Sequence, residues 1–169
     1  EEQYQLENTE SIRQQKQTLL VVDDDTEVAH YLKALLSPVY NVVCRFDADS
    51  AFKAMSEEAP DLVLSDVVMP GRNGYDLCRQ IKEDLQLCHI PVILVTAKAT
   101  VENQVEGLNT GADAYVTKPF EPNYLLALIK SQLKNREKVR SLLSRSTQTD
   151  EIEENVLSPQ DNTFMTELY

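Results

Sequence analysis

The sequence has few cysteines, no long apolar run and little positive charge. Its three cysteines, Cys44, Cys78 and Cys88, form no C-x-x-C pair and lie in or beside apolar-patterned segments, so we expect reduced thiols and no cysteine metal site. No run approaches the ~20 apolar residues of a membrane-spanning helix, and no signal peptide is recognisable. We therefore expect a cytoplasmic segment without membrane contact, and leave open an inner-membrane anchor elsewhere in a longer chain.

Acidic residues outnumber basic ones, and the formal net charge is −12. This charge argues against nucleic-acid binding by the segment itself. The charge is uneven, because residues 131–149 hold five bases and one acid, whereas residues 150–169 hold six acids and no base. Such blocks mark a boundary in the chain more than they indicate a function.

Five short apolar runs alternate with helix-patterned segments. The expected strands are residues 19–22, 40–46, 62–66, 92–96 and 114–118, and the expected helices begin at Thr26, at Ser50, after Asn73, near Thr100 and at Pro122. Continuous apolar strands favour a parallel sheet covered on both faces, and right-handed crossovers make it doubly wound. We predict an α/β fold with strand order 2-1-3-4-5 and an extended C-terminal helix.

The pattern outside this sheet predicts four parts. We expect a linker at residues 1–17, one domain at 18–136, a helical extension with an acidic linker at 137–157, and the start of another domain at 158–169. Helical character is predicted to end near Arg145. Its apolar positions are sparse, so a solvated end and a coiled-coil connector fit about equally.

Chemically useful side chains end four of the five predicted strands. Asp23 and Asp24 follow the first strand, Asp66 ends the third, Thr96 ends the fourth and Lys118 ends the fifth. In a parallel sheet these ends share one edge, where open α/β sheets bind ligands. The convergence favours a functional site over the simpler reading of Asp66 as a turn cap.

Three adjacent carboxylates repel one another and need a cation. Oxygen ligands suit a hard ion such as Mg²⁺, and Lys118 adds one further positive charge. Asp66 is then a candidate nucleophile for phosphoryl transfer, with Thr96 as a hydrogen-bond donor to the transferred group. A structural ion pair is the alternative role for Lys118. A cis bond before Pro119 would direct the lysine toward the site.

With these residues in place, the chain closely resembles the receiver domain of two-component response regulators over about residues 18–133. The resemblance rests on Val22-Asp23-Asp24, on Asp66 to Gly74 with Met69-Pro70-Gly71, on Thr96-Ala97, and on Lys118-Pro119-Phe120. It implies a flavodoxin-like fold. It also implies that Asp66 accepts a phosphoryl group from a kinase phosphohistidine.

The same resemblance implies roles for the neighbouring residues. Asp24 and Asp66 would bind Mg²⁺ directly, with the Val68 carbonyl as a third ligand and Asp23 acting through water. Thr96 and Tyr115 match the switch pair of the family, in which the aromatic ring turns inward from the surface. This movement would reshape the face made by the fourth helix, fifth strand and fifth helix, and we expect self-association through that face. Val68 and Lys98 flank the expected water path and predict slow self-hydrolysis.

The flanking segments resemble hybrid histidine kinases that carry a receiver and an AraC-type DNA-binding domain, so a transcriptional output is expected through a missing domain. Within this segment we expect no enzyme activity beyond self-phosphorylation. Two rivals are a pseudo-receiver, opposed by the intact site residues, and a haloacid-dehalogenase-type phosphatase. The latter needs a second aspartate at the position of Val68.

Overall fold

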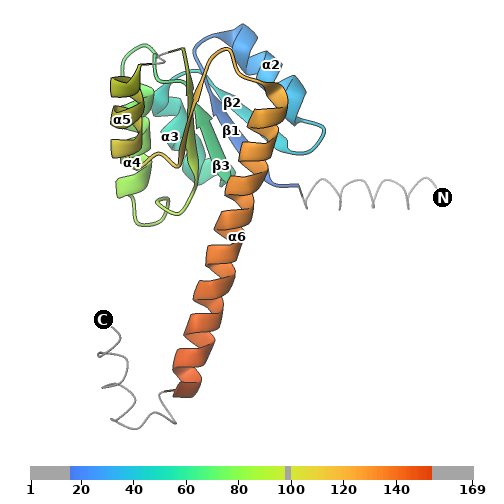
Figure 1. Cartoon of the computed structure of the whole chain (residues 1–169), viewed down its shortest axis with the longest axis vertical. Helices are drawn as coiled ribbons and strands as arrows, with labels where there is room; N and C mark the ends of the chain where they lie inside the picture. Colours follow the sequence, from blue (N-terminus) through green and yellow to red (C-terminus); the bar gives the residue numbers. More distant parts are fainter. Residues whose placement is uncertain (1–15, 98–99, 154–169) are drawn as a thin grey trace, which may run out of the picture. The chain divides into compact units, whose positions relative to one another are not determined.

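The computed structural model describes residues 16–97 and 100–153, and it contains the predicted five-stranded parallel sheet (Figure 1). The strands are β1 (Thr18–Val22), β2 (Asn41–Arg45), β3 (Leu62–Ser65), β4 (Val92–Thr96) and β5 (Ala114–Thr117). The helices are α2 (Thr26–Leu36), α3 (Ala48–Glu58), α4 (Gly74–Glu83), α5 (Val101–Asn109) and α6 (Pro122–Glu153). The strand order β2-β1-β3-β4-β5 confirms the predicted doubly wound, flavodoxin-like fold.

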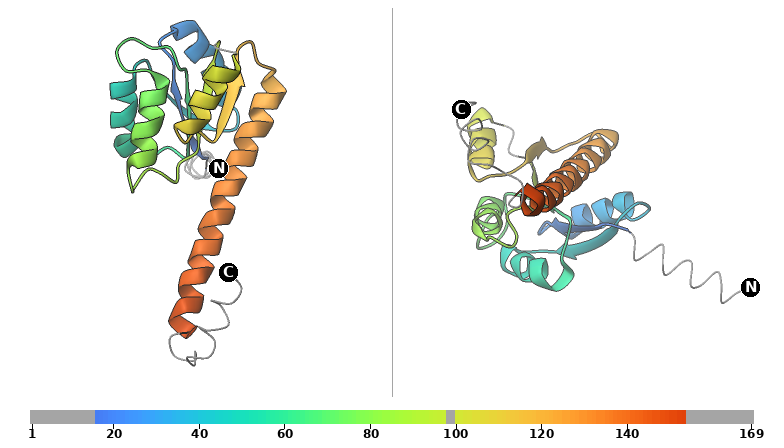
Figure 2. Two further views of the ribbon diagram at one scale, coloured as in Figure 1. Left: turned by 60° about the vertical axis from the view of Figure 1, so that its left-hand side comes forward. Right: turned by 90° about the horizontal axis from the view of Figure 1, so that it is seen from below.

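Helices cover both faces of the sheet because the strands are apolar on both sides. Helices α3, α4 and α5 lie on one face, and α2 and the first turns of α6 lie on the other (Figures 1 and 2). The two faces bury separate hydrophobic clusters. Leu20, Val22 and Val63 point into the α3/α4 cluster, while their neighbours Leu19 and Val21 point into the α2/α6 cluster.

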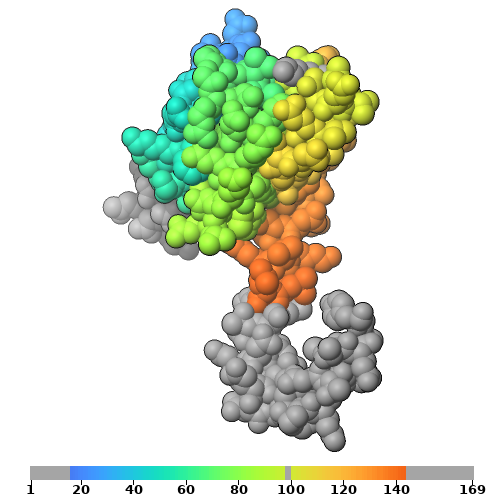
Figure 3. All heavy atoms as spheres, turned by 90° about the vertical axis from the view of Figure 1, so that its left-hand side faces the viewer, coloured from blue at the N-terminus to red at the C-terminus, as the bar shows by residue number. Residues whose placement is uncertain are grey.

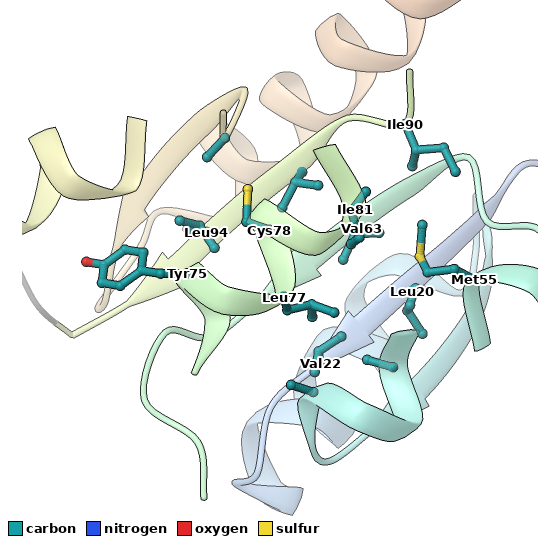
Figure 4. Close-up of a cluster of buried hydrophobic side chains, with 14 of the residues drawn as sticks. Leu20, Val22, Met55, Val63, Tyr75, Leu77, Cys78, Ile81, Ile90 and Leu94 are labelled. Atoms are coloured by element: carbon teal, nitrogen blue, oxygen red, sulfur yellow. The ribbon is translucent and has the colours of Figure 1, made fainter. Parts of the chain in front are cut away.

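The α3/α4 cluster packs against the centre of the sheet (Figure 4). Met55 from α3 and Leu77, Cys78 and Ile81 from α4 are all at most 1% exposed. The space-filling view of this side shows α3, α4 and α5 as neighbouring layers of one surface (Figure 3). The burial of Cys78 agrees with its prediction as a reduced core thiol, and all three cysteines are free.

Side-chain caps define the starts of four helices. Asp25, Asp47 and Thr100 each accept hydrogen bonds from backbone N–H groups of the first helical turn. Asn73, the residue predicted to precede this helix, forms a reciprocal capping box with Asp76 at the start of α4. This box fixes the chain where it leaves the segment that follows β3.

Two helix bounds differ from the sequence prediction. Helix α3 begins at Ala48 instead of Ser50, because Asp47 is its N-cap. Helix α6 ends at Glu153, so our prediction of an end near Arg145 was wrong. The polar composition after Arg145 suggested a linker, but residues 123–158 contain neither glycine nor proline to end a helix.

The chain forms two compact units that divide between Leu133 and Lys134. Leu133 is also the last residue of the α2/α6 cluster, so Pro122–Leu133 of α6 belongs to the sheet domain. The described part of the second unit is the remaining helix, residues 134–153. The predicted domain start at 158–169 lies outside the described residues. Within residues 16–97 and 100–153, no helix has the length and hydropathy that a membrane crossing requires.

Candidate functional site

The register of the sheet brings the predicted site residues to one edge. Backbone pairing continues one residue beyond two strands, because the Asp66 N–H donates to the Val22 carbonyl and the Lys118 N–H donates to the Thr96 carbonyl, each at 2.8 Å. Asp66 is thereby fixed beside β1, whose C-terminal end leads directly into Asp23. Strands β1, β3, β4 and β5 thus all end at the same edge of the sheet, as the predicted parallel topology required.

Three carboxylates converge there. Asp23, Asp24 and Asp66 each have a carboxylate oxygen within 4.8 Å of the others, a spacing that could hold a metal ion. Their environments differ, because the side chain of Asp23 is 3% exposed and that of Asp66 is 12% exposed, whereas Asp24 is open to solvent. A cation from solvent would therefore enter this cluster from the side of Asp24.

Lys118 lies between two of these carboxylates. Its Nζ is 2.8 Å from Asp23 Oδ2 and 3.4 Å from Asp66 Oδ2. The bond between Lys118 and Pro119 is cis, as predicted from the sequence. The described cluster carries formal charges of three carboxylates and one ammonium, which leaves two negative charges and suits a divalent cation.

Burial and neighbouring charges shift the pKa values of Asp66 and Lys118. Burial and the nearby charge of Asp23 raise the pKa of Asp66, although Lys118 and the Val67 N–H partly offset this increase. Burial acts to lower the pKa of Lys118, but its bond to Asp23 and the charge of Asp66 outweigh burial and raise that pKa. Lys118 therefore stays protonated beside the carboxylates.

Hydrogen bonds orient two of the carboxylates. Asp66 Oδ1 accepts the Val67 N–H at 2.7 Å. Asp23 Oδ1 accepts the Asp25 N–H at 2.9 Å, while its other oxygen faces Lys118. Both oxygens of Asp23 are thus bound, whereas the exposed side chain of Asp24 makes no hydrogen bond or ion pair among the described residues.

The segment after β3 folds tightly against Asp66. Gly74 donates its N–H to the Val67 carbonyl at 2.8 Å, and a Cβ at this glycine would collide with the Asp66 carbonyl oxygen. Only glycine therefore allows α4 to begin this close to the candidate nucleophile. Val68 is 55% exposed, whereas Lys98, the other residue of the expected water path, lies outside the described residues.

The two predicted switch residues lie on neighbouring strands. Thr96 is buried at the end of β4, and Tyr115 lies opposite Leu94 in β5. We expected Tyr115 to be at the surface, but its half-buried ring packs against the α3/α4 cluster. The sequence reasoning missed two neighbours of this ring, Tyr75 and Gly107. A glycine inside a helix was the one signal that could have identified the second.

Comparisons with known proteins agree with this geometry. The sequence model of the family described as "Response regulator receiver domain" matches residues 19–130. The chain is also 36% identical over 132 residues to Histidine kinase P4 of Formosa agariphila. That match covers 78% of this chain and 10% of the relative, so the chain spans about a tenth of the length of the kinase.

Solved structures show the same architecture. A CheY-like response regulator receiver domain from Methanospirillum hungatei is 34% identical, with a TM-score of 0.68 over 73% of this chain and 98% of the other. The receiver domain of a signal transduction histidine kinase from Syntrophus aciditrophicus is 35% identical, with a TM-score of 0.67 over 70% and 91%. Sequence, fold and carboxylate edge agree, and the chain belongs to the response regulator receiver domain family, the phosphoacceptor module of two-component signalling.

Proposed function

We propose that Asp66 accepts a phosphoryl group from a kinase phosphohistidine in a Mg²⁺-dependent reaction. The observation that carries this proposal is the placement of Asp66 beside two further carboxylates and the ammonium of Lys118. The Lys118 ammonium would flank Asp66 on one side, and a Mg²⁺ ion held by the carboxylates would flank it on the other. A carboxylate between two cations is a nucleophile that can accept a highly charged group. Asp23 has the same neighbours, but its side chain is only 3% exposed, whereas that of Asp66 is 12% exposed and more open to an incoming phosphoryl group.

The transfer step forms one bond and breaks one. A carboxylate oxygen of Asp66 attacks phosphorus, the phosphorus–nitrogen bond of the phosphohistidine breaks, and its electron pair remains on the imidazole. The product is an acyl phosphate on Asp66. Lys118 faces the Asp66 oxygen at 3.4 Å and can neutralise charge on the transferred group, and the Thr96 hydroxyl donates a hydrogen bond to one of its oxygens.

The carboxylates divide into direct and indirect metal ligands. Asp24, Asp66 and the Val68 carbonyl would hold Mg²⁺ directly, and Asp23 would act through water. The position of Asp23 supports this division, because Asp23 is less exposed than Asp66 and has the shorter contact to Lys118, 2.8 Å against 3.4 Å. When bound, Mg²⁺ supplies positive charge that the phosphoryl oxygens need.

An apolar surface beside Lys118 fits the phosphohistidine domain of a kinase as the docking partner. A pocket of about 410 Å³ is bounded by Glu27, Val28 and Tyr31 of α2 and by the Lys118–Phe120 segment. Tyr31 is 50% exposed, and its ring lies 6.3 Å from that of Phe120. Both rings can be covered by a partner that reaches Asp66 from this side.

The output surface is the face of α5, β5 and the first turns of α6. Exposed side chains of Val101, Val105 and Leu108 follow one side of α5, and a groove of about 280 Å³ lies beside Tyr115 and Tyr124. Phosphorylation changes the charge at Asp66 by about one unit and draws Thr96 and Lys118 toward the phosphoryl group. We infer that this face then binds a second copy of the chain.

We propose that a protein carrying this receiver uses the signal to control transcription. The kinase relative supports a sensor in which a kinase and the receiver share one chain. We propose that α6, which continues to Glu153, leads to a downstream AraC-type domain that binds DNA. In that arrangement the phosphotransferase activity belongs to the kinase part. The receiver itself contributes only self-phosphorylation.

Phosphoryl uptake tests the proposal and separates it from the pseudo-receiver. Incubated with Mg²⁺ and acetyl phosphate, the chain should gain one phosphoryl group by intact-mass measurement. Asp66→Asn should gain none, whereas Asp49→Asn, an exposed carboxylate on α3, should behave as wild type. Equal labelling of the Asp66→Asn protein would reject the assignment.

A further inference from the structure

Tyr75 joins helix α4 to helix α5. It lies in the first turn of α4 and is 3% exposed, so its ring is part of the α3/α4 cluster. Its hydroxyl points away from Leu77 and Ile81 (Figure 4) and donates to the Asn103 carbonyl at 3.0 Å. That carbonyl belongs to the first turn of α5. A buried tyrosine thus uses its ring for packing and its hydroxyl to fix a neighbouring helix.

Tyr115 lies in a notch that only glycine leaves open. A Cβ at Gly107 would stand 2.6 Å from Tyr115 Cδ2 and 2.9 Å from Cε2, closer than real Cβ atoms approach other side chains. Glycine is unfavourable inside a helix, and the close contact with the Tyr115 ring is the packing reason for its presence here. The tyrosine ring can lie flush against α5. A hydrogen bond with Tyr75 also holds this ring.

The start of α4 connects this pair to Asp66. Gly74, directly before Tyr75, contacts the Asp66 carbonyl so closely that a side chain would collide with it. The Gly74 N–H is bound to the Val67 carbonyl at 2.8 Å, and the Asn73–Asp76 capping box fixes the same turn. Because this turn is closely packed and fixed by hydrogen bonds, a displacement of the Asp66 segment should also displace Tyr75.

We propose that Tyr75 is a positioning residue that holds Tyr115 in the Gly107 notch and ties α5 to the segment carrying Asp66. A change at Asp66 then reaches α5 through Tyr75 as well as through Thr96. The link from phosphorylation to α5 rests on the proposed function above. The positioning of Tyr115 by Tyr75 does not, since it concerns contacts that can be measured without phosphorylation.

Removing one hydroxyl tests the positioning role. Tyr75→Phe keeps the ring and loses the bonds to Asn103 and Tyr115, and Tyr40→Phe is the matched control because Tyr40 is buried on the opposite face of the sheet. Backbone amides of Val101–Asn109 should exchange roughly 2- to 10-fold faster in Tyr75→Phe, the range expected for a lost hydrogen bond. The control should leave them unchanged. Equal exchange in wild type and Tyr75→Phe would overturn the proposal.

A direct view of Tyr115 comes from fluorine NMR. The chain has seven tyrosines, so 3-fluorotyrosine gives seven signals that single Tyr→Phe variants assign. The Tyr115 signal should move or broaden in Tyr75→Phe and should shift toward the solvent-exposed position in Gly107→Ala. Alanine ordinarily stabilises a helix relative to glycine, so displacement of Tyr115 in a folded Gly107→Ala protein identifies the notch. An unchanged Tyr115 signal in both variants would refute the positioning role.

Phosphorylation assays distinguish the two proposals. Tyr75→Phe should accept a phosphoryl group on Asp66 from acetyl phosphate as wild type does, because Tyr75 touches none of the site carboxylates. Its α5 amides should respond less than those of wild type when beryllofluoride and Mg²⁺ are added. Failure of wild type to take up phosphate would reject the proposed function alone. A normal α5 response in Tyr75→Phe would reject the transmission through Tyr75.

Discussion

At the residue scale, the fold buries carboxylate charge at the site, and neighbouring groups must stabilise that charge. Asp23 is almost fully buried, and its two oxygens are bound by Lys118 and by a backbone N–H. Asp66 has the longer contact to Lys118 and stays closer to solvent. Lys118 therefore pairs more closely with Asp23, and Asp66 is left as the more accessible of the two carboxylates.

This imbalance predicts a pH effect on stability. Because the pKa of Asp66 is raised in the folded protein, the folded state holds this proton more tightly than the unfolded state does. The contribution of Asp66 to stability therefore falls as pH rises from about 3.9, the ordinary aspartate value, through the raised pKa. Denaturant unfolding with a chelator present should show Asp66→Asn gaining stability over wild type across this window.

Other groups do not obscure the comparison. The lowered pKa of Asp47, caused by its N-cap bonds to Ser50, changes stability in the opposite sense but in both proteins equally. Adding Mg²⁺ should narrow the difference, because a cation offsets the charge of Asp66. A wild type that becomes more stable than Asp66→Asn between pH 4 and 7 without metal would contradict the account of the site.

Val68 predicts the lifetime of the phosphoryl group. This side chain is 55% exposed two residues after Asp66 and offers no atom that could orient a water molecule. Self-hydrolysis should therefore be slower than that of a freely hydrolysing acyl phosphate. Val68→Asn should speed the decay, measured by intact mass over time, and Val39→Asn, also exposed but distant in sequence, should not. Equal decay in Val68→Asn and wild type would count against this role.

At the element scale, α6 has two parts with different packing. Leu125, Ile129 and Leu133 are at most 3% exposed and lie in the α2/α6 cluster. In the following turns Val139, Leu142 and Leu143 are all more than half exposed. The helix is continuous through both parts, and Leu133 is its last residue in the buried cluster.

Stability measurements should separate these two parts. Ile129→Ala creates a cavity in the core and should lower the free energy of unfolding by about 2–5 kcal/mol. Val139→Ala replaces an exposed side chain with a better helix former and should change it by less than about 0.5 kcal/mol. Chemical denaturation measures both. A large loss in the second variant would mean that residues beyond Leu133 share the core.

Strands and helices were predictable where hydrophobic periodicity, N-cap residues and helix-breaking residues agreed. The apolar run before Asp66 predicted β3, Asn73 predicted the start of α4, and parallel topology then predicted that Lys118 lies near Asp66. The end of α6 was missed because polar composition was taken as a linker where no residue breaks the helix. Tyr75 was missed because its hydroxyl bonds Asn103, 28 residues further along the chain, and such a contact has no local pattern. Gly107 carried a local signal, a glycine inside a predicted helix, but nothing in the sequence connected it with the ring of Tyr115.

At the scale of the whole molecule, the exposed apolar side of α5 predicts self-association. The side chains of Val101, Val105 and Leu108 are 74%, 50% and 54% exposed, and each lies one helical turn from the next. Beryllofluoride with Mg²⁺ should promote dimers in sedimentation experiments. Val105→Ser should weaken them, whereas Val39→Ser should not. An unchanged monomer, or association that survives Asp66→Ala, would contradict this prediction.

The site of phosphorylation tests the central claim most directly. An acyl phosphate is reduced by borohydride, which converts a phosphorylated aspartate to homoserine, so the modified residue can be read by peptide sequencing in a mass spectrometer. After treatment with Mg²⁺ and acetyl phosphate, homoserine should appear at Asp66 alone and should require Mg²⁺. Homoserine at Asp23 or Asp24, or at no residue of a protein that has gained a phosphoryl group, would contradict the account.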